Sequence, residues 1–95
     1  MEPGRRRAAL SGPGPAAPLR LLTRTDCSLC ETMRVQLAML ASRVLLPPLE
    51  LVDVDSDPEL QRRYGLKVPV LLWGATPVCH YRLDEPELLR LLRRP

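Results

Sequence analysis

Apolar and polar residues change their spacing several times along the chain, and each change predicts a new element. The segment Leu19–Thr23 is short and mostly apolar, as in a buried strand. From Ser28 to Arg43 the apolar positions instead fall three or four residues apart, which predicts one face of a helix formed by Leu29, Met33, Leu37 and Leu40. Pro47 and Pro48 cannot continue that helix, so it must end before them.

The segment 49–55 alternates at its start and is rich in β-formers, which predicts a second strand. Asp57 and Pro58 have the residue types of a helix start, because Asp caps free amides and Pro suits the first helical position. Gly65 follows Tyr64 and can supply a left-handed cap, which predicts a short second helix.

The last third of the chain predicts a hairpin and a closing helix. The segments 70–73 and 77–81 are strands on either side of a tight turn at Gly74-Ala75. Pro77 fits only at the start of a strand or on an edge strand. Asp84 then caps the last helix, and Glu87 completes a capping box. Its apolar face comprises Leu88, Leu89, Leu91 and Leu92.

The predicted order of elements is β-α-β-α-β-β-α. A strand, helix and strand in succession favour a parallel pair with a right-handed crossover, whereas the tight turn favours an antiparallel hairpin. The expected fold class is therefore α/β, with a four-stranded mixed sheet and helices on both faces.

Composition divides the chain of 95 residues into two parts. Residues 1–18 show neither the helical nor the strand spacing of apolar residues and are rich in Ala, Gly and Pro. This composition predicts a disordered leader before a single domain at 19–95. Three arginines and one glutamate place +2 of the total charge of +3 in that leader. The remaining domain is nearly neutral and holds only three aromatic residues, so nucleic acid is not an expected partner.

No apolar run approaches the roughly 18 residues that span a bilayer, so no membrane partner is expected. The leader also lacks the apolar centre of a secretory signal, and its prolines disfavour the amphipathic helix of an organelle transit peptide. Three cysteines, an odd number, fit a secreted disulfide framework poorly. We therefore expect a monomer in the reducing cytoplasm.

Cys27 and Cys30 enclose two residues at the point where the first strand turns into a helix, and such a pair can exchange between dithiol and disulfide. Free amides and the helix dipole favour a thiolate at Cys27, and Arg24 adds positive charge. Asp26 and Glu31 oppose this effect, which predicts a moderately acidified attacking thiol. Cys30 lies one turn further into the helix, should be more buried, and would resolve a mixed disulfide.

Two other uses of these cysteines remain open. A purely structural disulfide across so short a loop stabilises little. A zinc site would draw on Cys27, Cys30, Cys79 and His80, but adjacent residues of a strand point to opposite faces. Cys79 itself is a small buried hydrophobe or a second redox group, and His80 is a strand-face residue or a general base.

Val68-Pro69 lies just before the third strand. A cis peptide there would bend the loop and expose the backbone groups of Val68 to an extended thiol substrate. An ordinary trans proline at a strand start fits the spacing equally well.

Taken together, these motifs resemble small glutaredoxin-like proteins of the thioredoxin superfamily. The resemblance runs from about Leu19 to Leu92 and is carried by Arg24, Cys27-Ser28-Leu29-Cys30, Val68-Pro69 and the closing strand and helix with Asp84. It implies a thioredoxin-like fold of the glutaredoxin type, a nucleophilic Cys27, a resolving Cys30 and a cis Pro69 that faces them.

The resemblance also implies a glutathione site. A basic residue at the place of Arg24 would help bind the glutathione carboxylate, the Val68 backbone would pair with its cysteine, and Asp84 would receive the γ-glutamyl end. The sequence departs from the family at Ser28-Leu29, at Lys67 in place of Thr, and at Cys79-His80 in place of Gly-Gly. The side chains of Cys79 and His80 add bulk where glutathione would bind. Lys67 adds positive charge that can offset the resulting loss of affinity for glutathione.

The leading functional hypothesis is a thiol–disulfide oxidoreductase that uses the Cys27/Cys30 dithiol to reduce protein or glutathione mixed disulfides. No bound cofactor or metal is expected, and glutathione would be a co-substrate. The alternative is a binding or adaptor module that keeps the fold with little turnover.

Overall fold

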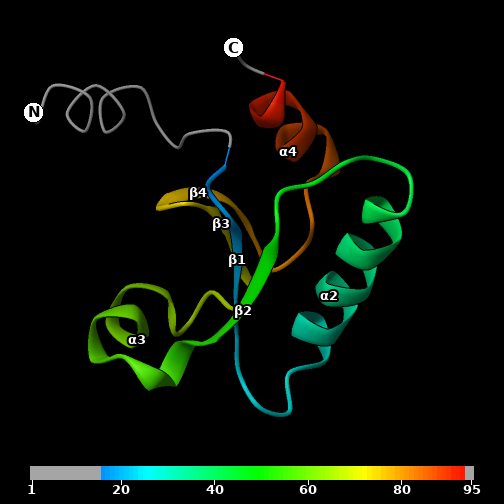
Figure 1. Cartoon of the computed structure of the whole chain (residues 1–95). Coiled ribbons are helices and arrows are strands. Elements are labelled where there is room, and N and C mark those ends of the chain that lie inside the picture. The colour runs from blue at the N-terminus through cyan, green and yellow to red at the C-terminus, as the bar shows by residue number, and fades with distance from the viewer. Residues whose placement is uncertain (1–15, 94–95) are drawn as a thin grey trace, which may run out of the picture.

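The computed structural model describes residues 16–93 and confirms the predicted order of elements (Figure 1). They are β1 Leu19–Thr23, α2 Ser28–Ala41, β2 Leu49–Asp53, the 3-10 turn η1 Val54–Ser56, α3 Pro58–Tyr64, β3 Val70–Trp73, β4 Thr76–His80 and α4 Glu85–Leu92.

The four strands form one mixed sheet in the order β2-β1-β3-β4. β1 runs parallel to β2 and antiparallel to β3, and β3 runs antiparallel to β4. The hairpin between β3 and β4 turns at Gly74, whose φ of 61° favours glycine. Pro77 lies on the edge strand β4, next to a break in the register with β3, where its missing donor does least harm. This is the thioredoxin-like α/β fold that the sequence predicts.

Alternating residues of the central strands point to opposite faces and create two apolar clusters. On one face, Leu21 and Leu71 pack with α2 and α4 through residues that include Leu37 and Leu88. On the other face the cluster comprises Leu22, Val54, Val70 and Leu72, with Leu60 and Tyr64 of α3 packed against it. Helices therefore cover both faces of the sheet, with α2 and α4 on one side and α3 on the other (Figure 1).

The apolar stripe of α2 differs from the predicted one at its first position. Leu29 is 42% exposed, whereas Cys30 is only 4% exposed and lies on the buried face with Met33, Leu37 and Leu40. Spacings of three, four and three from Cys30 describe that face better than a stripe that begins at Leu29. The resolving cysteine is thus part of the packed side of the helix.

Gly65 does not have the predicted left-handed conformation, because its φ is −57°. The chain instead makes a further turn, in which the Lys67 amide donates to the Tyr64 carbonyl at 2.8 Å. Glycine is required here by close approach. A Cβ at this position would lie 2.5 Å from the Gln61 carbonyl oxygen and 3.3 Å from a guanidinium nitrogen of Arg24.

Carboxylates set several element ends. The predicted strand 49–55 ends at Asp53, because the Asp53 side chain accepts from the Asp55 amide at 2.9 Å and starts η1. Asp57 and Asp84 cap α3 and α4 as predicted, through the amides of Glu59 and Glu87. The Glu87 carboxylate also accepts two hydrogen bonds from Arg90.

Residues 1–15 of the predicted leader lie outside the described residues. The leader's last residues contact the hairpin: the Ala17 carbonyl accepts from the Trp73 indole at 3.1 Å, and the Pro18 carbonyl accepts from the Gly74 amide at 2.9 Å. Within residues 16–93, no helix combines the length and apolar character that crossing a membrane requires.

Candidate functional site

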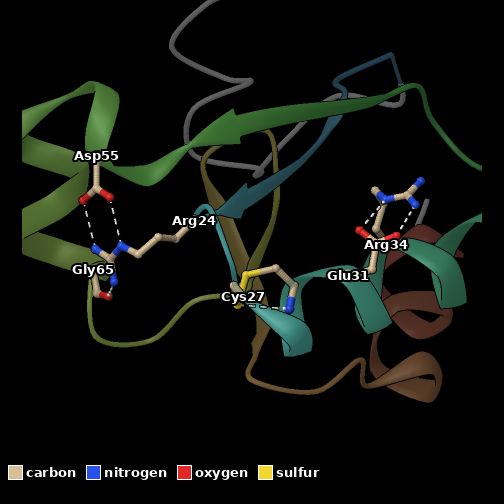
Figure 2. The surroundings of a disulfide bond; sticks show 7 residues. Arg24, Cys27, Glu31, Arg34, Asp55 and Gly65 are labelled. Atoms are coloured by element: carbon tan, nitrogen blue, oxygen red, sulfur yellow. Dashed lines mark hydrogen bonds and ion pairs between the residues drawn. A yellow bond between two sulfur atoms is a disulfide. The ribbon is translucent and has the colours of Figure 1, made fainter.

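The two cysteines lie at the start of α2 and are joined by a disulfide (Figure 2). Cys27 is the N-cap residue, with extended backbone, and its sulfur accepts the Cys30 amide at 3.1 Å. Cys30 is buried while Cys27 is partly exposed, which confirms the predicted difference in burial. The Cys30 amide and the helix start thus lie against the sulfur of the more exposed cysteine, an arrangement that favours negative charge there.

A hollow of about 630 Å³ lies beside the disulfide. Its lining includes both cysteines, Leu51 of the edge strand β2, and four charged residues, namely Arg24, Asp26, Glu31 and Arg34. Arg34 forms a bidentate ion pair with Glu31, which lowers the pKa of the Glu31 carboxyl. The two positive and two negative charges of this lining cancel.

Arg24 was predicted to meet a substrate carboxylate, but its side chain extends away from Cys27 toward α3 (Figure 2). Its guanidinium donates to both carboxylate oxygens of Asp55 at 2.9 Å and to the Gly65 carbonyl at 2.8 Å. The Gln61 amide donates to the same carboxylate at 2.9 Å. In this structure the guanidinium of Arg24 is thus bound within the protein.

The loop before β3 carries Lys67, Val68 and Pro69. It meets the sheet at the end where β1 finishes, because β3 runs antiparallel to β1. The Val68–Pro69 peptide is cis. Pro69 is buried, Val68 is half-buried and Lys67 is exposed. Among residues 16–93, no carboxylate lies within ion-pair distance of the Lys67 ammonium. Of the two basic residues predicted to bind substrate, Arg24 is paired with Asp55, whereas Lys67 has no ion-pair partner among residues 16–93.

The predicted Asp84 end of the site lies beside a second hollow of about 550 Å³, whose lining also includes Cys79 and His80. Cys79 packs against the core, and burial raises the pKa of its thiol. His80 is exposed and meets the Tyr81 ring edge-on, at 4.7 Å between centroids. In the described part of the chain, no three His, Cys, Asp or Glu side chains are grouped as a metal ion would require.

The family model described as Glutaredoxin-like domain (DUF836) matches residues 18–93. The chain belongs to this glutaredoxin-like family. The match covers both cysteines, the Val68-Pro69 step and Asp84, and it includes Pro18, which joins the hairpin.

Two solved structures resemble this glutaredoxin-like domain. Protein Ne2328 from Nitrosomonas europaea is 31% identical, with a TM-score of 0.72, over 80% of this chain and 91% of that chain. Protein XcR50 from X. campestris is 32% identical, with a TM-score of 0.60, over 81% of this chain and 99% of that chain. A comparison with curated proteins found no match.

Sequence reasoning missed two residues of this glutaredoxin-like site, Asp55 and Tyr81. Asp55 follows the second strand as one of several acidic residues, and nothing in its spacing singles it out as the partner of Arg24. Tyr81 ends the predicted strand 77–81, where an aromatic residue would most simply pack on the hairpin. It is instead 46% exposed, and its hydroxyl donates to the Leu66 carbonyl at 2.8 Å.

The Arg24–Asp55 pair predicts an acid-sensitive contribution to folding. The hydrogen bond from Arg24 lowers the pKa of the Asp55 carboxyl below its ordinary value of 3.8. A lowered folded-state pKa means that this stabilisation is complete above the unfolded-state pKa and is lost as the pH falls through the folded-state value. We expect the unfolding free energy of the Asp55→Asn variant, measured by urea titration, to fall less steeply than that of the parent below about pH 4.

Asp26→Asn is the matched control, since Asp26 is exposed and no arginine pairs with it among residues 16–93. Asparagine also tolerates the left-handed backbone at this position, where φ is 60°. Equal acid slopes for the parent and Asp55→Asn would show that the ion pair does not contribute to folding.

Proposed function

We propose that this protein is a thiol–disulfide oxidoreductase whose Cys27/Cys30 dithiol reduces protein or glutathione mixed disulfides. The observation that carries the proposal is the pairing of an N-cap sulfur that accepts a helix amide with a buried partner sulfur one turn away. The first favours an attacking thiolate, and the second keeps the resolving thiol within reach of it.

The proposed reaction has two exchange steps. The Cys27 thiolate attacks one sulfur of the substrate disulfide, that S–S bond breaks, and the departing thiolate takes up a proton. The Cys30 thiol then loses its proton and attacks the Cys27 sulfur, which forms the Cys27–Cys30 disulfide and releases the second substrate thiol. The substrate gains two electrons and two protons, and two molecules of an external thiol such as glutathione then return the protein to the dithiol while they are oxidised to a disulfide.

Glutathione is proposed as a co-substrate that meets Lys67, the Val68 backbone and Asp84. The Lys67 ammonium, which has no ion-pair partner among residues 16–93, would attract a carboxylate of the tripeptide. The Cys79 and His80 side chains narrow the place where the γ-glutamyl end would lie, and Arg24 is already paired with Asp55. We therefore expect weaker binding of glutathione than of an extended protein disulfide.

The cytoplasmic setting, the monomeric state and the lack of nucleic-acid or membrane partners stay predictions.

Replacement of the resolving thiol tests the proposal. In the Cys30→Ser variant the second exchange step is blocked, so substrate is expected to remain joined to Cys27 as a mixed disulfide. Mass spectrometry of the intact protein after incubation with glutathione disulfide or a disulfide-containing peptide measures the adduct. Treatment with a small dithiol should remove it completely.

The parent protein supplies the control, because it should pass through the adduct and accumulate the internal disulfide instead. A Cys30→Ser variant that gains no adduct from either substrate, alongside a parent that reduces neither, would favour a glutaredoxin-like binding module without turnover.

A further inference from the structure

The loop from Gly65 to Pro69, which carries Val68, receives side-chain hydrogen bonds from both neighbouring strands. Arg24, just after β1, donates from Nη1 to the Gly65 carbonyl at 2.8 Å. Tyr81, just after β4, donates from its hydroxyl to the Leu66 carbonyl, also at 2.8 Å. Since β1 and β4 flank β3 in the sheet, two consecutive carbonyls of the loop are held from opposite sides.

Tyr81 makes this contact from an unfavourable backbone conformation. Its φ is 68°, a value that is rare for a bulky side chain. Core burial does not account for it, because the residue is 46% exposed. The Tyr81 amide also donates to the Pro69 carbonyl at 2.8 Å, so the residue is hydrogen-bonded to the loop at both Leu66 and Pro69. Backbone strain of this kind is often retained where it serves a function.

Arg24 is fixed on its other side by Asp55. A bidentate arginine–carboxylate pair is more rigid than a single contact, and Gln61 donates to the same carboxylate. The absence of a Cβ at Gly65 lets the guanidinium approach, since a Cβ would lie 3.3 Å from Nη2. Figure 2 shows that the Arg24 side chain reaches Asp55 and Gly65 together, away from the disulfide.

We propose that Arg24 and Tyr81 are positioning residues that fix the backbone of Val68, the group that the proposed function pairs with the substrate. They act on the loop and not on the substrate, so substrate affinity should depend on them while the reactivity of Cys27 should not. This inference replaces the expectation that Arg24 binds a substrate carboxylate. Its kinetic consequence rests on the proposed oxidoreductase function, whereas its structural consequence does not.

Amide hydrogen exchange in the oxidised protein tests the structural consequence. The Lys67 and Tyr81 amides are both hydrogen-bonded within this region, and NMR can follow each of them. Tyr81→Phe removes the hydrogen bond to the Leu66 carbonyl, and Arg24→Lys weakens the one to the Gly65 carbonyl. For each variant we expect roughly 3- to 10-fold faster exchange at these amides, as the loss of one hydrogen bond implies. For Arg24→Lys the reason is that a single ammonium cannot donate to Asp55 and Gly65 in the planar geometry of the guanidinium.

Arg34→Lys is the matched control, because it loosens an exposed arginine–carboxylate pair that does not contact the loop. Unchanged exchange in Tyr81→Phe and Arg24→Lys overturns the proposal. An equal increase in Arg34→Lys also overturns it, since the effect would then be general loosening.

Kinetics separate positioning from direct binding of a carboxylate. If Arg24 positions the loop, Arg24→Lys and Arg24→Gln should raise KM for a disulfide substrate to the same extent, roughly 3- to 10-fold, with kcat unchanged. If Arg24 binds a carboxylate by charge, Lys should retain affinity that Gln loses, and that pattern overturns the proposal. A parent without turnover contradicts the proposed function alone, and the exchange measurement still decides this inference.

Discussion

Replacement of Cys27 by serine is expected to lower the rate of disulfide reduction by at least about a thousandfold. The attacking species is a thiolate, and a serine hydroxyl does not ionise near neutral pH to replace it. Removal of a covalent nucleophile is among the largest effects that a single substitution has on a catalysed rate. The measurement is the rate of reduction of a mixed disulfide between glutathione and a peptide, with glutathione as the regenerating thiol.

Cys79→Ser is the matched control for this experiment. Cys79 is the remaining cysteine, packs against the core, and has a thiol pKa raised by burial, so it is less ionised than an ordinary thiol. We expect this variant to retain most of the parental rate. A rate that falls in Cys79→Ser and survives in Cys27→Ser would reverse the assignment and give Cys79 the redox role that the sequence left open.

Leu71→Ala is expected to lower the free energy of unfolding by about 2–5 kcal/mol. Leu71 is fully buried and lies on β3, opposite Leu21 of β1 and Cys79 of β4. Truncation leaves a cavity where both neighbouring strands and the helices above them limit collapse. Urea unfolding followed by Trp73 fluorescence measures the effect, since Trp73 belongs to the same cluster.

A small domain has a total stability of about 5–15 kcal/mol, so this loss would leave a large fraction of its molecules unfolded at moderate urea concentrations. Leu66→Ala is the surface control for the same chemical change, because Leu66 is 91% exposed. Its stability should stay within about 0.5 kcal/mol of the parent. Similar losses in the two variants would mean that the cluster around Leu71 is not the main source of stability.

The core and the candidate site are connected through α2. Cys30 shares the buried face of this helix with Met33, Leu37 and Leu40, and packing of that face holds the start of the helix over the sheet. The same burial that stabilises the domain therefore sets where Cys27 meets solvent.

Local chemistry was sufficient to predict much of the fold and the thiol pair. Proline and capping aspartates marked the helix starts, since Asp57 and Asp84 satisfy free amides wherever the chain continues as a helix. A buried strand followed by a helix start located Cys27, and a position one turn further in predicted the burial of Cys30. These are interactions between residues close in sequence, so the sequence itself contains them.

The tertiary structure decided the points that depend on distant residues. Arg24 carries the same charge whether it meets a substrate or Asp55, and only the packing of α3 against the sheet determines which partner it has. Likewise, the sequence identified Tyr81 as an aromatic residue of the hairpin, but the fold places its hydroxyl on Leu66. Local spacing thus determined the dithiol, whereas long-range hydrogen bonds determined what holds the loop from Gly65 to Pro69.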